Sequence, residues 1–319
     1  MIQVRKTIIA ILFIAVSSSA RSQGYKQVDD YVKKLGSLDS MNMGTIANLL
    51  TKNFPDKINK TRAIFDWIAF NISYDCKAAR NSDNSKTGSE EILKTRMATA
   101  FGYAALFQDM CSVAGIRCLT VDGYSKTTTT EDDELPEGFN HSWNVVQLGQ
   151  SPSEWYYVDP TWGSGYTDND VKVFTRSFND KYFFTDNAIF NATHFPDNTA
   201  WLLGGARGGQ NKKTFFSMPG IKPQAIEFGI TGVKPAQSHI KAKVGKPVQF
   251  SIDVSNKDAI GIVSLAMGDA KKRKTKQVDY STAGSSIVFS YKFQEADEFP
   301  VSVLFNGKEV IVFWVVVEE

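Results

Sequence analysis

The spacing of apolar residues divides the chain into a helical first part and a strand-rich remainder. Residues 23–50 and 60–71 carry apolar positions at helical intervals, and the first of these patterns predicts helices that pack against the main domain. A third helical pattern begins at Ala100 and stops at Gly115, since glycine commonly follows the last residue of a helix. Strand-like runs follow between residues 118 and 185. The pattern therefore predicts an α+β domain in which helices pack on an antiparallel sheet.

A break in composition separates this first domain, residues 23–205, from the rest of the chain. The run Gly204–Lys213 is rich in glycine and lacks the Gly-Lys-Ser/Thr of a phosphate-binding loop, so we expect a linker over residues 206–227. Alternating apolar residues in 247–254 mark one buried face of a strand. Further β-rich runs lie at 259–267, 286–293, 299–305 and 310–317. This spacing is typical of a small all-β immunoglobulin-like sandwich, which we place at residues 228–319.

The composition is that of a globular protein without a polyanionic partner. The chain has 319 residues, of which 42% are hydrophobic and 22% are charged, and its formal net charge is +2. This balance argues against nucleic acid as a partner. The basic run Lys271–Lys276 is therefore interpreted first as a solvated hairpin tip, with an anion-binding patch as the alternative.

The first 22 residues have the pattern of a secretory signal peptide. A short positive segment ends at Lys6, an apolar core runs from Thr7 to Val16, and small residues follow up to Ser22. Cleavage after Ser22 would release an exported protein, either periplasmic or extracellular. The apolar core is too short to span a bilayer comfortably, and no later run reaches the ~20 apolar residues that a spanning helix needs. We therefore expect no membrane span.

The cysteines and histidines do not suggest a metal or cofactor site. Cys111 and Cys118 bracket a predicted helix end and strand, so a disulfide and two buried thiols are both compatible with the sequence. The three histidines are scattered along the chain, and no Cys-x-x-Cys motif is present. We therefore predict no metal ion and no cofactor.

Three short motifs carry the candidate chemistry. The first is the loop-to-helix step around Ala100, the second is an extended run that begins near His141, and the third is an aromatic strand that ends at Asp159. These motifs resemble the transglutaminase-like branch of the papain-type cysteine proteases and acyltransferases. In that branch a helix is followed by a strand with a histidine and then by a strand with an aspartate, in the same chain order. The resemblance implies a papain-like core of helices packed on an antiparallel sheet.

The resemblance can be followed position by position. The run Gly102-Tyr103-Ala104 fixes the frame, so the nucleophile position of the family falls on Ala100. The His-x-Trp-Asn motif falls on His141–Asn144, and the Asp-x-Thr-Trp-Gly motif falls on Asp159–Gly163. Further runs look like the branch of the family named after the kyphoscoliosis peptidase, and they are Lys60–Ile68, Ile72–Asp75, Tyr182–Thr185, His194–Asn198 and Trp201. The likeness covers about residues 40–205.

The resemblance also implies which step of the chemistry is lost. In the family, a cysteine thiolate at a helix N-terminus attacks the substrate, a histidine carries the proton and an aspartate holds the histidine in one tautomer. His141 and Asp159 retain their positions, but the methyl group of Ala100 cannot act as a nucleophile. We therefore expect a secreted pseudoenzyme that binds a peptide or protein segment, such as a cell-wall peptide, in the ancestral cleft. Trp143, Trp162 and Tyr103 are the expected binding residues.

Two alternatives remain open. The first is an active peptidase, amidase or acyltransferase that uses a nucleophile at another position. The second is a structural or scaffolding protein. The side chain of Thr99 is turned by about 100° from the nucleophile position, and Cys111 lies on the order of 16 Å along the helix. The sequence does not fix the position of Cys76, which remains a candidate for a migrated nucleophile. The loop 126–136 is interpreted as a solvated loop, with a lid over the site as the alternative.

Overall fold

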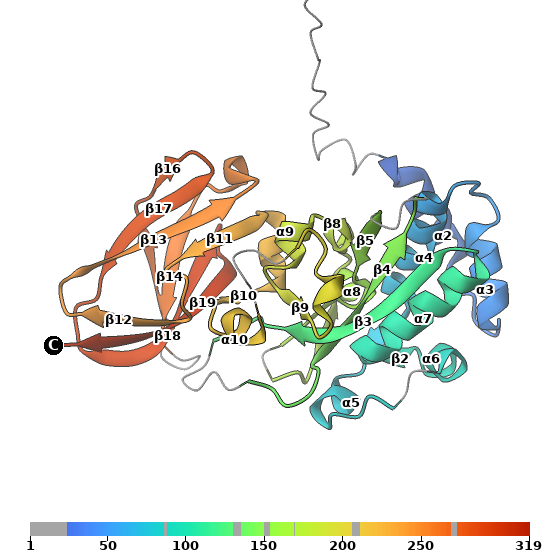
Figure 1. The fold of residues 1–319 in the computed structure, drawn as a ribbon, viewed down its shortest axis with the longest axis horizontal. Helices are drawn as coiled ribbons and strands as arrows, with labels where there is room; N and C mark the ends of the chain where they lie inside the picture. Colours follow the sequence, from blue (N-terminus) through green and yellow to red (C-terminus); the bar gives the residue numbers. More distant parts are fainter. Residues whose placement is uncertain are drawn as a thin grey trace, which may run out of the picture.

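The computed structural model describes residues 24–85, 88–129, 135–149, 154–168, 170–205, 211–268 and 273–319. The predicted signal peptide at residues 1–22 lies outside the described residues. Figure 1 shows two units side by side, an α+β domain that contains the helices and an all-β domain that ends at the C-terminus. The α+β fold class and the order of the two domains are confirmed.

Short helices with polar caps form the N-terminal part of the first domain. Their bounds are α2 (Lys26–Leu35), α3 (Met43–Thr51), α4 (Lys57–Asn71), α5 (Cys76–Arg80) and α6 (Ser89–Thr95). The side chains of Asn42 and Asp56 accept hydrogen bonds from backbone N–H groups in the first turns of α3 and α4. Gly36, at a φ of 69°, follows the last residue of α2. The helical pattern of residues 23–50 is therefore two helices with a break between them.

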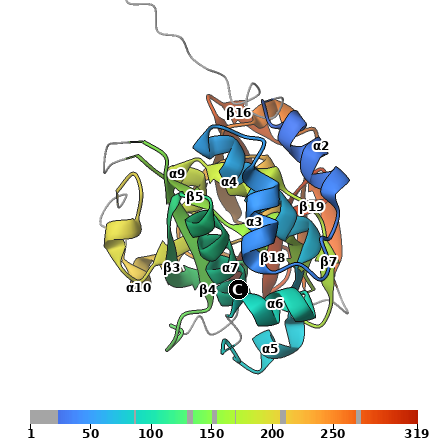
Figure 2. The same ribbon diagram turned by 90° about the vertical axis from the view of Figure 1, so that its right-hand side faces the viewer.

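A five-stranded antiparallel sheet forms the centre of the first domain. Its strand order is β8-β5-β4-β3-β9, and all seven residues of the central strand β4 are buried. The bounds of its strands are β3 (Arg117–Ser125), β4 (His141–Gln147), β5 (Trp155–Val158), β8 (Phe183–Thr185) and β9 (His194–Pro196). Figure 1 shows α2, α3, α4, α6 and α7 on the side of the first domain away from the all-β domain, and Figure 2 shows these helices facing the viewer.

Helix α7 (Ala100–Val113) packs directly on β3 and β4 and fixes the orientation of the site. The Gln108 side chain accepts hydrogen bonds from the backbone N–H and the hydroxyl of Thr120 in β3. The Asn144 side chain in β4 donates to the backbone carbonyl of Ala104 at 3.0 Å. Because β3 returns antiparallel to α7 and pairs with β4, the start of α7 and the His141 end of β4 lie at the same end of the sheet.

Smaller elements complete the first domain. They are β1 (Ser73–Tyr74), β2 (Met97–Ala98), α8 (Pro160–Ser164), β6 (Gly165–Thr167), β7 (Phe174–Arg176), η1 (Asp180–Tyr182), α9 (Asn187–Phe190) and η2 (Thr199–Trp201). β1 pairs with β2 in parallel, and this pairing holds the segment before α7 beside Tyr74. β6 and β7 form a hairpin that follows α8 directly.

The second domain is a sandwich of two sheets. Its strands are β10 (Gly220–Ile221), β11 (Ile230–Lys234), β12 (His239–Lys243), β13 (Pro247–Val254), β14 (Val263–Met267), β15 (Lys274–Val278), β16 (Ser281–Ala283), β17 (Ser286–Lys292), β18 (Asp297–Phe305) and β19 (Lys308–Glu318). One sheet has the order β11-β13-β17-β16, and the other has β10-β19-β18-β14-β15 with β12 also paired to β19. Phe250, Ile252 and Val254 are buried between the sheets, as their alternation predicts.

Several segments of the second domain differ from the sequence expectation. The described part of the predicted linker 206–227 is not a simple linker, because residues 211–227 contain α10 (Lys212–Phe216), β10 and the 3-10 helix η4 (Pro223–Glu227). The predicted strand 259–267 begins only at Val263. Lys274 and Lys276 of the predicted hairpin tip lie in β15, and the rest of that tip falls partly outside the described residues.

The two domains are joined by buried hydrogen bonds. The Thr129 hydroxyl donates to the carbonyl of Val312 in β19 and accepts from the N–H of Gly220 in β10, both at 2.9 Å. The Lys126 ammonium donates to the carbonyl of Phe216 in α10. Thr129 and Lys126 belong to the predicted loop 126–136, so the described start of this loop is held by the second domain. Residues 130–134 of the loop lie outside the described residues.

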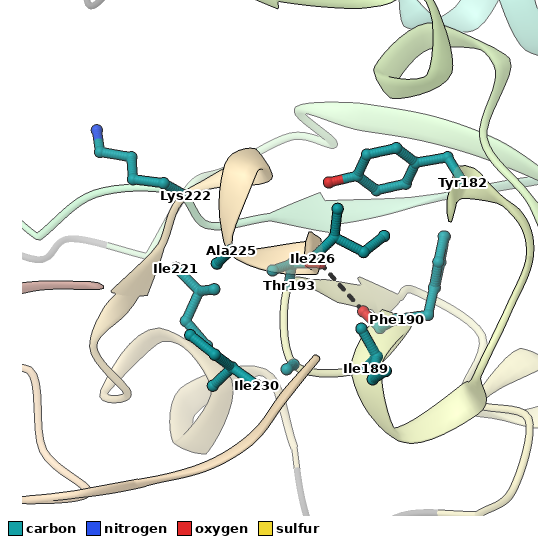
Figure 3. A pocket seen from close by; sticks show the side chains of 10 residues that line it. Tyr182, Ile189, Phe190, Thr193, Ile221, Lys222, Ala225, Ile226 and Ile230 are labelled. Atoms are coloured by element: carbon teal, nitrogen blue, oxygen red, sulfur yellow. Dashed lines mark hydrogen bonds between the residues drawn. The ribbon is translucent and has the colours of Figure 1, made fainter. Parts of the chain in front are cut away.

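The contact between the domains is closely packed. A cavity of only about 10 Å³ lies between them. Figure 3 shows its lining, which includes Tyr182 and Phe190 of the first domain and Ile221 and Ile230 of the second. This volume holds no more than about one water molecule, so the cavity is not a ligand site. Within the described parts of the chain, no helix is long and apolar enough to cross a membrane.

We predict that Thr129→Val lowers the free energy of unfolding by about 2 kcal/mol, because the buried N–H of Gly220 and the carbonyl of Val312 lose their partner. Urea denaturation followed by circular dichroism measures this loss. Thr128→Val is the matched control, since Thr128 is exposed and makes none of these bonds. An equal effect of both substitutions would contradict the role given to the Thr129 hydroxyl.

Candidate functional site

His141 and Asp159 form a buried hydrogen-bonded pair at one end of the neighbouring strands β4 and β5. The His141 Nε2 atom lies 2.8 Å from Asp159 Oδ2. His141 is the first residue of β4, and Asp159 follows the last residue of β5. The exposed fraction is 3% for His141 and 0% for Asp159, so the pair is shielded from bulk water. The structure therefore brings together the two residues that the sequence assigned to the retained part of a triad.

The Asp159 carboxylate is also the N-cap of α8. Its Oδ1 atom accepts the backbone N–H of Trp162 at 3.0 Å, and Pro160 occupies the first helical position. Gly163 in the same turn packs against Phe65, whose ring would lie 2.4 Å from a Cβ atom at that position. The motif Asp-x-Thr-Trp-Gly is thus a helix start that fixes the carboxylate. The other carboxylate oxygen of Asp159, Oδ2, faces the histidines.

A second histidine shares this carboxylate oxygen. His194, the first residue of β9, places its Nε2 atom 3.2 Å from Asp159 Oδ2 and is fully buried. Its Nδ1 atom lies 2.8 Å from the Thr193 hydroxyl. Because an ionised carboxylate only accepts hydrogen bonds, both histidines carry their proton on Nε2 in this arrangement. The Thr193 hydroxyl then donates to Nδ1 of His194.

Aromatic rings enclose the two imidazoles. The Trp162 ring centroid lies 4.4 Å from that of His194 and 5.4 Å from that of His141. Phe190 stacks on His194 at 3.9 Å, and Trp143 lies edge-on to the same imidazole at 5.2 Å. These apolar walls exclude water from the hydrogen bonds to Asp159, which strengthens those hydrogen bonds.

The charge states follow from burial and from this hydrogen bonding. Burial by itself would raise the pKa of the Asp159 carboxyl, but His141 and His194 outweigh it and hold the pKa well below its usual range. Burial lowers the pKa of His194 to about 4, although the hydrogen bond to Asp159 opposes this shift. At neutral pH the site therefore holds an ionised carboxylate and a neutral His194.

Helix α7 packs against α8, the helix that Asp159 caps. Ala100 is the first residue of the helix, and its exposed fraction is 2%. One turn later, the Tyr103 hydroxyl donates to the carbonyl of Ile72 at 2.6 Å and accepts a hydrogen bond from Ser164 of α8 at 3.2 Å. Burial raises the pKa of Tyr103, and the charge of Asp159 adds to this shift. The second turn of α7 therefore contacts the helix that begins after Asp159, and the assignment of Ala100 to the nucleophile position stays a prediction.

A cleft of about 890 Å³ opens beside the pair, between the two domains. Its lining in the first domain includes Tyr74, His141, Thr161, Trp162 and Tyr166. The second domain and the connecting segment contribute the opposite wall, which consists of Lys222, Pro223, Gln224, Glu227, Lys308 and Glu309. In the described part of the chain, Nδ1 of His141 has no hydrogen-bond partner. This nitrogen is the polar atom that the pair offers to a ligand.

Two of the predicted binding residues do not reach this cleft. Trp143 and Tyr103 are fully buried, so the expectation that they contact a ligand is wrong. The Trp143 ring packs against the rings of Phe190 and His194. The Tyr103 hydroxyl donates its hydrogen bond to the carbonyl of Ile72. Trp162 lines the cleft, and its contact with a ligand stays a prediction. The described residues Thr127 and Thr128 of the predicted loop 126–136 also line it.

The three cysteines Cys76, Cys111 and Cys118 are buried free thiols. Cys111 and Cys118 are buried, and burial together with their mutual hydrogen bond raises the pKa of Cys111 well above its usual value. Burial also raises the pKa of the Cys76 thiol at the start of α5. Cys76 is absent from the described residues that line the cleft. To act as a migrated nucleophile, Cys76 would therefore need a lower thiol pKa and a position on the wall of the cleft.

The histidines are not scattered in space, contrary to their spacing in the sequence. His141, Asp159 and His194 offer three ligand atoms that lie within 4.8 Å of one another, and among the described residues this is the one such group. The sequence assigned no role to His194, although it lies in a motif of the kyphoscoliosis-peptidase-like branch. The motif His194–Asn198 was therefore the signal in the sequence that could have assigned His194 to the site.

We predict that stability falls as His194 is forced to take up a proton. Its folded pKa of about 4 lies below its ordinary value of 6.5, so its contribution is present above pH 6.5 and is lost as the pH falls toward 4. Between pH 7 and pH 4 the wild type should lose about 3 kcal/mol more than His194→Gln. Urea denaturation at both pH values, with EDTA present, measures the difference.

The control for this measurement is His239→Gln, which removes a histidine of the second domain. His239 lies in β12, remote in the fold from Asp159. This variant should lose stability in parallel with the wild type. If His194→Gln also parallels the wild type, His194 is not held neutral by burial.

Comparison with known proteins places these motifs in a family. Residues 44–160 match the transglutaminase-like superfamily. A kyphoscoliosis peptidase from Mus musculus is 34% identical over 236 residues, which cover 71% of this chain and 35% of that protein. A kyphoscoliosis peptidase from Homo sapiens is 32% identical over 265 residues, which cover 80% of this chain and 39% of that protein.

The chain thus spans less than half of the length of these two relatives. A solved structure described as the crystal structure of a TGase is 15% identical and covers 54% of this chain and 39% of its own, with a TM-score of 0.29. The order of the motifs, the geometry of the pair and the sequence matches agree. The chain therefore carries a transglutaminase-like domain at residues 44–160 and is related to the kyphoscoliosis peptidases.

Proposed function

We propose that this protein is a catalytically inactive relative of the transglutaminase-like enzymes that binds an extended polypeptide segment in the cleft between its domains. One observation carries the proposal: the His141–Asp159 pair borders a cleft of about 890 Å³, while the first residue of the adjacent helix is Ala100. The site thus retains the groups that position a substrate. It lacks the group that would attack one.

The chemistry of acyl transfer explains why the alanine removes turnover. A thiolate must attack the carbonyl carbon, and the methyl group of Ala100 has no lone pair to donate. The neighbouring Thr99 hydroxyl is buried without a hydrogen-bond partner among the described residues, but an alcohol at this place has no base bonded to it. His141 donates to Asp159 through Nε2, so only Nδ1 remains to interact with a bound molecule.

The walls of the cleft suit a peptide ligand. Trp162 and Tyr166 provide aromatic surface, and Tyr166 is 42% exposed. From the opposite wall, the Lys222 ammonium makes no hydrogen bond or ion pair with any described residue. A carboxylate or a backbone carbonyl of the ligand could accept from it. The size of the cleft falls within the range of about 300–1,000 Å³ that is usual for ligand sites.

The second domain belongs to this proposed site. Tyr182 donates a hydrogen bond to the carbonyl of Pro223 at 2.9 Å, and Lys308 forms an ion pair with Glu227 at 2.6 Å. These bonds hold η4 and the start of β19 in place along the cleft. The signal-peptide pattern of residues 1–22 supports the further proposal that the protein acts outside the cytoplasm, where cell-wall peptides and other exported polypeptides are available.

We predict that Tyr166→Ala weakens binding of peptides to the cleft about tenfold or more, because an aromatic anchor on the cleft wall is lost. A library of extended peptides, including cell-wall peptides, is screened by fluorescence polarisation, and hits are measured with both proteins. Phe139→Ala is a matched control, since Phe139 has the same exposed fraction of 42% and is not among the residues that line the cleft.

Two outcomes of this screen would count against the proposal. One is that no peptide binds the wild type. The other is that Tyr166→Ala and Phe139→Ala weaken binding equally, which would place the ligand elsewhere. Release of a fluorescent product from a peptide or amine substrate by the wild type would show an active enzyme instead.

We predict that Ala100→Cys creates a thiol with a pKa at least about one unit below the usual 8.5, because the helix N-terminus and a protonated His141 stabilise a thiolate. NMR of protein labelled with ¹³C at the cysteine Cβ follows each thiol through a pH titration. This readout does not depend on access of a reagent to the buried position.

The wild type supplies the background signals of Cys76, Cys111 and Cys118. Adding His141→Gln to Ala100→Cys should return the new thiol to a pKa at or above the usual value. A raised pKa in the presence of His141 would mean that burial dominates, and that Ala100 does not occupy the nucleophile position.

A further inference from the structure

We propose that His141, Asp159 and His194 form a binding site for one divalent transition-metal ion of the zinc class. The three side chains come from β4, from the N-cap of α8 and from β9. Their ligand atoms lie within 4.8 Å of one another. Two imidazole nitrogens and one carboxylate oxygen are the donors of many open zinc sites in proteins.

The two distances from the carboxylate oxygen to the imidazole nitrogens suit coordination. Asp159 Oδ2 lies 2.8 Å from Nε2 of His141 and 3.2 Å from Nε2 of His194. Around an ion with bonds of about 2.0–2.2 Å, neighbouring ligand atoms are roughly 3 Å apart. The carboxylate oxygen can therefore remain in place while the ion takes the position of the two Nε2 protons.

The groups behind the ligands are those that support a metal site. The second carboxylate oxygen of Asp159 is held by the backbone N–H of Trp162 at 3.0 Å. Coordination through Nε2 requires the proton of each imidazole to move to Nδ1. For His194 this nitrogen already faces the carbonyl of Phe190 at 3.3 Å and the hydroxyl of Thr193 at 2.8 Å, and either oxygen can accept its proton.

The cleft gives access to the site and leaves a coordination position open. His141 and Thr161 line the cleft, whereas His194 and Asp159 lie behind them. Three protein ligands leave at least one further position for water or for an atom of a ligand in the cleft. The Thr161 hydroxyl is buried without a hydrogen-bond partner among the described residues, so it is available to bind such a water.

Electrostatics favour a cation at this place. Asp159 is fully buried, and its two charge-bearing neighbours are histidines that are cations only when protonated. A buried carboxylate without an opposite charge is costly, and a divalent ion removes that cost. Imidazole donors select zinc, cobalt, nickel or copper over calcium and magnesium, which prefer oxygen ligands.

This inference does not depend on the proposed peptide binding. A protein that binds peptides but no metal would overturn only the metal site, and a protein that binds metal but no peptides would overturn only the proposed function. Both measurements therefore use the same purified chain, one with EDTA and one with added metal.

The test is a titration of the EDTA-treated protein with Co²⁺, followed by displacement with Zn²⁺. We expect one ion per chain and visible d–d absorption of a four- or five-coordinate ion without a thiolate charge-transfer band. The missing band distinguishes this site from the thiols of Cys111 and Cys118. Ca²⁺ should not compete. X-ray absorption of the zinc form should count two imidazole ligands.

Variants assign the ligands. His141→Gln and His194→Gln should each weaken Zn²⁺ binding by at least about 100-fold, since each removes a direct ligand. His239→Gln removes the third histidine of the chain and should bind as the wild type does. If the first two variants do not fold, the Co²⁺ spectrum and the imidazole count of the wild type decide alone. No binding by the wild type, thiolate coordination, or unchanged affinity in a folded His194→Gln would overturn the proposal.

Discussion

The site depends on one buried carboxylate. Asp159 is fully buried, yet it accepts hydrogen bonds from His141, from His194 and from the backbone of Trp162. Each bond fixes a different element, because the three donors belong to β4, β9 and α8. An ionised group in such surroundings is stable only while all of its hydrogen bonds are made. The position of Asp159 therefore determines where the strands end and how the imidazoles are turned.

The same constraint explains how the site keeps its form with an alanine at position 100. The sulfur of a cysteine would be one small group at the start of α7, and the buried network does not include residue 100. With an alanine at position 100, the Asp159 carboxylate keeps all of its hydrogen bonds, and only Nδ1 of His141 lacks a partner among the described residues. His141, Asp159 and the helix start can thus persist on structural grounds alone, and the cleft beside them stays open.

Much of this arrangement is readable in the sequence, because its signals are local. The helical pattern after Ala100, the alternation in Phe250, Ile252 and Val254, and the His-x-Trp-Asn motif each depend on residues a few positions apart. The order of the motifs then pairs His141 with Asp159, and the structure agrees. The register of β3 with β4 puts the start of α7 and the His141 end of β4 at the same end of the sheet.

The sequence-based predictions that were wrong or missing concern contacts between segments that are distant along the chain. His194 reaches Asp159 because β9 pairs with the far edge of β3, and no pattern near residue 194 encodes that pairing. Trp143 was expected at the cleft, but Phe190 and His194 cover it from another part of the chain. The predicted linker contains structure because residues 211–227 are ordered by the domains on either side, not by their own composition.

The bond between Thr129 and β19 has a consequence for how this protein can diversify. The segment that leads into β4 is fastened to the second domain, so a first domain transferred alone to another protein would carry exposed polar groups and a half-open cleft. Recombination would therefore be expected to move the two domains as one unit. In keeping with this, the similarity to the human relative covers 80% of the chain, which is more than the first domain could supply by itself.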